Sequence, residues 1–102
     1  MILELEEAKQ WLRVDGDEED GTIQMLIKAA ESYLYNATGI EYDAESDLAR
    51  LLCLVLVSDW YENRELGTGK VSEKVRFTVS SITAQLQYAQ SKEGDTDESG
   101  SP

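Results

Sequence analysis

Five carboxylates crowd the segment Asp15–Asp20, DGDEED, and acids at alternating positions close to a glycine suggest a calcium-binding loop. An EF-hand loop takes oxygen ligands from positions 1, 3 and 5, has glycine at position 6 and closes with a bidentate Glu at position 12. When counting starts at Asp15, the first three ligands are in register, but position 6 is Asp20 and position 12 is Leu26. Because the glycine is misplaced and the closing carboxylate is absent, the spacing argues against a metal site.

The start of a helix explains the same acids. Unpaired N–H groups and the positive end of the helix dipole favour exposed carboxylates in a first turn, each by about 0.3–1 kcal/mol. Apolar residues recur at helical spacing from Ile23 onward. We therefore predict that Asp17 is the N-cap of a helix, with Glu18, Glu19 and Asp20 in its first turn.

Residues that could catalyse a reaction are few. The chain has no histidine, the commonest general base and metal ligand. Its one cysteine, Cys53, lies in an apolar run, which predicts a buried, reduced thiol rather than a nucleophile. The segment GTGK, residues 67–70, lacks the spacing of a phosphate-binding loop, and Val71 stands where that loop has Ser or Thr. The sequence predicts no enzyme, no cofactor, and no catalytic, cofactor-binding or metal-binding residue.

Trp60, Tyr61, Asn63 and Arg64 form a second chemically notable group at the end of a long apolar stretch. In a helix, Trp60 and Arg64 lie one turn apart. One interpretation, which the sequence favours, is that the aromatic rings close the end of the hydrophobic core. The alternative is a contact with a neighbouring subunit or partner, where Trp, Tyr and Arg are enriched. Both can hold for different members of the cluster.

Helical periodicity predicts the elements that position these residues. Gly39 supplies a left-handed stop for the second helix. The third helix is apolar nearly all round, LARLLCLVLVSDWY, so we expect it to be buried on several sides at the centre of the domain. The fold class is mainly α, a small bundle of about four helices. Their expected ranges are 4–13, 18–38, 47–66 and 79–90.

The last third of the chain is expected to differ from the helical part in two places. The segment KVRFTV alternates, with Val75, Phe77 and Val79 on one side, and indicates a short extended segment near residues 71–78. From Ser91 onward the chain has no apolar residue, which predicts a disordered acidic tail. The expected organisation is one helical domain, 1–90, followed by the tail, 91–102.

Charge limits the classes of partner. The chain has 102 residues and a net charge of −12, from 21 acids and 9 bases. Lys and Arg supply most of the affinity of proteins for phosphate backbones, so direct wrapping of nucleic acid is not expected. The N-terminus shows no secretory signal, and the longest apolar run is far shorter than the roughly 20 residues of a membrane span. These features are typical of a soluble intracellular protein.

In order, the short helix ending LEEAKQWLRVD, the turn GDEED, the helix IQMLIKAAESYLYNATG and the apolar helix ending LVSDWYENRE resemble the phage head–tail connector family. The likeness covers about residues 3–66, and more loosely VSSITAQLQ as a final helix. Its strongest parts are Leu12-Arg13, the acidic turn, Ala29-Ala30 and the segment 61–64.

This resemblance implies a structural virion protein at the head–tail junction, assembled in the host cytoplasm. It implies a homo-oligomeric ring under the portal protein, joined to tail or stopper proteins, through which DNA passes without sequence-specific binding. Trp60, Tyr61, Asn63 and Arg64 become candidates for a subunit or portal contact. An alternative from another class is an acidic DNA mimic or regulatory protein that binds a nucleic-acid enzyme, which explains the charge equally well.

Overall fold

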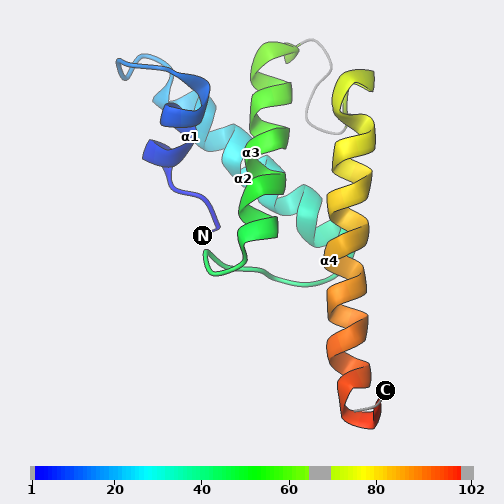
Figure 1. Ribbon diagram of the computed structural model, residues 1–102. Coiled ribbons are helices and arrows are strands. Elements are labelled where there is room, and N and C mark those ends of the chain that lie inside the picture. The colour runs from blue at the N-terminus through cyan, green and yellow to red at the C-terminus, as the bar shows by residue number, and fades with distance from the viewer. Residues whose placement is uncertain (1, 65–69, 100–102) are drawn as a thin grey trace.

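The computed structural model describes residues 2–64 and 70–99, and within them the chain forms four helices and no strand. They are α1 (Leu5–Leu12), α2 (Asp20–Thr38), α3 (Asp47–Glu62) and α4 (Glu73–Ser99). Figure 1 shows α3 standing between α1 and α4, with α2 crossing behind it. The predicted small α-helical bundle is confirmed. None of the described helices is long and apolar enough to cross a lipid bilayer.

Helix α1 is short and is held by its ends and by neighbours. Glu4 and Glu7 form a reciprocal capping box, in which each side chain accepts a hydrogen bond from the other residue's backbone. The helix ends at Arg13, which adopts the left-handed conformation with φ 63°. Glu7 pairs with Arg50 of α3, and the backbone N–H of Ile2 donates to Glu31 of α2 at 2.8 Å. These bonds attach α1 to both of the long helices beside it.

Helix α2 begins two residues later than the acids alone predicted. Its N-cap is Glu19, and Asp17 lies before it in a turn, where its carbonyl accepts from the Asp20 N–H at 3.3 Å. The prediction of Asp17 as N-cap is therefore wrong. At the other end Gly39 has φ 76° and its N–H donates to the Tyr35 carbonyl, so the predicted left-handed stop is confirmed.

Helix α3 is the central element, as its composition predicted. It packs against each of the other three helices. Its N-cap is Ser46, whose hydroxyl accepts from the Ala49 N–H at 3.2 Å. Its buried residues share one half of the helix surface: Ala49, Leu52, Cys53, Leu56, Val57, Asp59 and Trp60. Leu51, on the other half, is 39% exposed. The helix ends at Glu62, earlier than the expected Leu66, which lies outside the described residues.

Helix α4 corrects the expected extended segment near 71–78, because it begins at Glu73. Val75, Val79, Ile82 and Leu86 recur at helical spacing and form one stripe against the core. Alternation had grouped Phe77 with the two valines, but in the helix Phe77 falls on the opposite side and is 83% exposed. The alternating pattern was thus the first turns of an amphipathic helix.

The C-terminal half of α4 projects beyond the rest of the bundle (Figure 1). Gln87 marks one of its last links to the other helices, since its side-chain amide donates to the Ala37 carbonyl of α2 at 2.8 Å. The backbone then continues as helix to Ser99, past the boundary at residue 90 that composition indicated. The division into a domain, 1–90, and a disordered tail, 91–102, remains a prediction.

We expect Leu52→Asp to lower the free energy of unfolding by at least about 3 kcal/mol. The Leu52 side chain is fully buried, so the variant loses apolar burial and places a charge where no partner awaits it. For a domain of this size, thermal melting should show a fall in Tm of about 12 °C or more. Leu51→Asp, on the adjacent residue that is 39% exposed, is the matched control and should melt close to wild type. Equal melting of the two variants would contradict the central placement of α3.

Deleting residues 91–102 should leave the melting temperature unchanged. This segment offers no apolar side chain to the core, and its backbone leaves the bundle. A deletion that starts at Leu86, which is 4% exposed, should by contrast destabilise the bundle. A large loss of stability on removing only 91–102 would show that the tail docks on the helices.

Candidate functional site

The C-terminal end of α3 gathers the residues that the sequence singled out. Trp60 is 1% exposed and packs edge-on against Tyr33 of α2, with ring centroids 6.1 Å apart and an interplanar angle of 67°. Its indole Nε1–H donates to the Lys70 carbonyl at 2.6 Å, across the connection that leads to α4. Trp60 therefore closes the core, and its indole has no surface to offer a partner in this structure.

Asp59 is a residue that sequence reasoning missed. Among the residues that the structure describes, it is the one charged side chain that is buried, at 4% exposure. Its carboxylate accepts from the Ser72 N–H at 2.9 Å, from the Ser72 hydroxyl at 2.5 Å and from the Asn63 amide at 3.1 Å. We call Asp59, Asn63 and Ser72 the α3–α4 clasp, because they join the end of α3 to the residue before α4.

A signal for the clasp was present in the sequence. An acid in the last turn of a helix opposes the negative end of the helix dipole, so Asp59 stands where acids are disfavoured. It also interrupts an apolar helix. Burial of a carboxylate without hydrogen bonds is strongly unfavourable, and three donors satisfy it here. Asn63, a predicted contact residue, is thereby committed to the clasp, and its amide also donates to the Asp59 carbonyl at 2.9 Å.

Tyr61 and Arg64 remain at the surface, and the structure brings them to the acidic turn. The Arg64 guanidinium lies 4.9 Å from the centre of the Tyr61 ring and pairs with Glu19 at 2.7 Å. A hydrogen bond with Glu19 raises the pKa of the Tyr61 hydroxyl. The carboxylate of Glu19 thus connects two features that are distant in the sequence, the acidic turn and the cluster at 60–64. We call Glu19, Tyr61 and Arg64 the surface triad.

The remaining acids of the turn divide between pairing and exposure. Asp20 pairs with Lys9 of α1 at 2.8 Å, and this hydrogen bond raises the pKa of the Lys9 ammonium. Asp15, Asp17 and Glu18 are exposed. Among the described residues, no group of three or more potential ligands is placed to hold a metal ion. The turn therefore acts here through ion pairs that connect it to α1 and to the end of α3.

Chemistry at the cysteine is limited by its surroundings. Cys53 is fully buried in α3, and burial, with a smaller effect of Glu31, raises the pKa of its thiol to about 12. A thiol with this pKa holds its proton at neutral pH, so little of the nucleophilic thiolate exists. Residues 67–69 of the GTGK segment lie outside the described residues. The carbonyl of its last residue, Lys70, accepts the hydrogen bond from the Trp60 indole.

Comparison with known proteins identifies one family for this chain. The sequence model of one family, described as phage gp6-like head-tail connector protein, matches residues 2–101. Neither the comparison with curated proteins nor the comparison with solved structures gave a match. The family match extends over the described helices, including α4, for which the resemblance in the sequence was weakest.

We expect Asp59→Ala to lower the free energy of unfolding by at least about 2 kcal/mol, because Ser72 and Asn63 lose their acceptor in a buried place. Chemical denaturation monitored by circular dichroism measures this change. The control is Glu62→Ala, which removes an exposed acid from the same turn of α3 and should change stability by less than about 0.5 kcal/mol. Equal stabilities of Asp59→Ala and wild type would show that the clasp contributes nothing to joining α3 and α4.

Proposed function

This chain belongs to the phage gp6-like head-tail connector family, and from that premise we propose that it forms a ring beneath the portal of a tailed phage. DNA passes through this ring, and tail or stopper proteins bind on its far side. The family has a structural role in phage particles. The observation that carries the proposal is the match over residues 2–101, nearly the whole chain.

The arrangement of helices supports assembly into a ring. Subunits in a closed ring make head-to-tail contacts, so each must present two different surfaces. Here α1 and α4 flank the α2–α3 pair in Figure 1, and within the described residues they do not contact each other. Two separate surfaces are therefore available on one rigid core.

The charge supports passage of DNA. A net charge of −12 repels phosphates and opposes tight binding of the DNA that moves through the ring. Exposed acids include Asp15, Asp17 and Glu18 in the turn before α2. We propose that the protein lets DNA slide and catalyses no reaction on it.

The surface triad is the proposed place for a subunit or portal contact. Tyr61 and Arg64 combine an aromatic ring, a guanidinium and a neighbouring carboxylate, the residue types enriched at such interfaces. Trp60 and Asn63 contribute indirectly, because their hydrogen bonds to the Lys70 and Asp59 carbonyls hold the end of α3 in place. We propose that the protein assembles in the host cytoplasm and resides at the head–tail junction of the virion.

Deletion of the gene from the phage that encodes this protein tests the proposal. We expect DNA-filled heads that fail to join tails or that leak their genome, visible by electron microscopy and as a loss of infectious particles. Wild-type protein supplied from a plasmid should restore tailed particles, and the Leu52→Asp protein, which we expect to be destabilised, should not. Normal tail joining without the protein would contradict the connector role. Recovery of the protein bound to a DNA-binding enzyme, by a salt-sensitive contact, would favour the acidic DNA mimic instead.

A further inference from the structure

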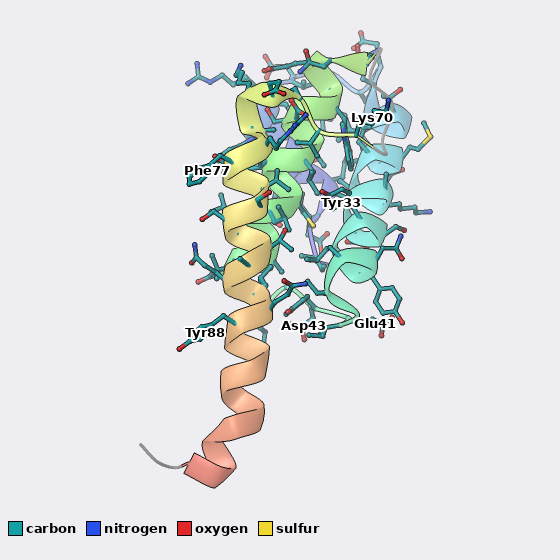
Figure 2. All side chains as sticks on the ribbon, turned by 90° about the vertical axis from the view of Figure 1, so that its right-hand side faces the viewer. Tyr33, Glu41, Asp43, Lys70, Phe77 and Tyr88 are labelled. Atoms are coloured by element: carbon teal, nitrogen blue, oxygen red, sulfur yellow. The ribbon has the colours of Figure 1, made fainter. Side chains whose placement is uncertain are left out.

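The outer face of α4 carries the most exposed apolar side chain of the described chain. Phe77 is 83% exposed and Tyr88 is 66% exposed. Figure 2 shows both side chains projecting to the same side of α4, away from the other helices. Ala84, also exposed, lies between them at helical spacing. We call Phe77, Ala84 and Tyr88 the α4 stripe.

The charge around the α4 stripe differs in sign from that of the rest of the chain. Residues 1–70 hold 16 acids and 6 bases, whereas residues 71–90 hold one acid, Glu73, and two bases, Lys74 and Arg76. Of these bases, Lys74 is one turn from Phe77 and forms no ion pair with the described residues, while Arg76 pairs with Glu73 at 3.3 Å. The N-terminal half of α4 is the net-positive segment of a strongly negative protein.

The opposite charge lies on the other side of the bundle. Residues 4–20, which form α1 and the turn after it, hold eight acids and two bases. Internal pairs involve Glu7, Glu19 and Asp20, while the five other acids are exposed: Glu4, Glu6, Asp15, Asp17 and Glu18. Trp11 adds an aromatic ring that is 49% exposed. We call this exposed surface the α1 face.

We propose that the α4 stripe, with the bases beside it, docks on the α1 face of a second copy of this chain, an inference that rests on the proposed ring. Two copies that each carry −12 repel each other over most of their surfaces. The approach with the least repulsion brings the basic segment of one copy to the acidic segment of the next. Because α1 and α4 lie on different sides of the α2–α3 pair, the contact is head-to-tail and repeats from copy to copy (Figure 1).

The apolar side chains give this contact its affinity and the charges its orientation. Burial of Phe77 and Tyr88 removes two aromatic surfaces from water, which is the larger favourable contribution in most protein interfaces. Opposite charges at the rim select the partner surface and disfavour the wrong one. The surface triad lies at the C-terminal end of α3 and adjoins the α1 face, because Glu19 directly follows Glu18.

Photocrosslinking in assembled phage particles tests the proposal. The photoreactive residue p-benzoylphenylalanine replaces Phe77 in the protein carried by the virion, and Tyr35, an aromatic residue of α2 that is 51% exposed, is replaced in the matched control. After irradiation, position 77 should give a dimer of this protein, and mass spectrometry should map the linkage to residues 4–20 of the other copy. Position 35 should give no linkage to that segment.

Other outcomes overturn the inference. Linkage from position 77 to the portal, to a tail protein or to another part of a second copy would assign the α4 stripe to a different occupant. The absence of any linkage in particles that contain the protein would show that the stripe faces solvent. If the particles lack the protein altogether, the connector role itself fails, which separates that failure from the failure of the docking surface.

Charge reversal provides an independent readout if position 77 does not accept the photoreactive residue. Lys74→Glu with Arg76→Glu should lower the yield of tailed particles, and so should Asp17→Lys with Glu18→Lys. The protein carrying all four substitutions should regain yield, because the two reversed surfaces again attract. Lys28→Glu, which reverses an exposed base on α2, is the control and should not lower the yield. No recovery in the fourfold variant would overturn the pairing of these two surfaces.

Discussion

The apolar surface of α3 has to be kept from water, and the other three helices pack against it for this reason, although Leu51 stays 39% exposed. The apolar side of α2 packs against α3, and so does the inner side of α4, which holds Val79, Ile82 and Leu86. Helix α1 packs against it as well. Each burial of a large aliphatic side chain stabilises the bundle by about 1.5–3 kcal/mol. The short helix α1 would not persist alone, so its attachment through Arg50 and Glu31 depends on the helices it covers.

The polar interactions of the bundle act at the ends of α3. At its C-terminus, Asp59 and Trp60 bind the segment that leads into α4, and Glu19 connects the acidic turn to Tyr61 and Arg64. A buried carboxylate in a last helical turn is unfavourable by itself, and its hydrogen bonds to Ser72 and Asn63 offset that cost. The chain thereby gains a defined angle between α3 and α4 and a rigid base for the surface triad.

The distribution of charge suits a connector better than its sum alone indicates. In the proposed ring, the total charge of −12 would repel DNA, but subunits that only repelled each other could not assemble. The positive segment at the start of α4 and the acids of the α1 face supply opposite signs on separate sides of one subunit. In the proposed ring, such a subunit would combine contact between neighbours with weak contact to the DNA that passes.

The sequence by itself determined the helical fold class, the central position of α3 and the stop at Gly39, because hydrophobic periodicity and glycine conformation are local properties. It could not distinguish two turns of an amphipathic helix from a short strand around Phe77, since six residues fit both periods. Only the tertiary structure decided that Trp60 is buried, that Tyr61 is partly buried and Arg64 exposed, and that Glu19 interacts with both. Those outcomes depend on how segments that are distant in the sequence pack together. The spacing of residues within one segment cannot predict a contact between Glu19 and Arg64, which lie in different segments.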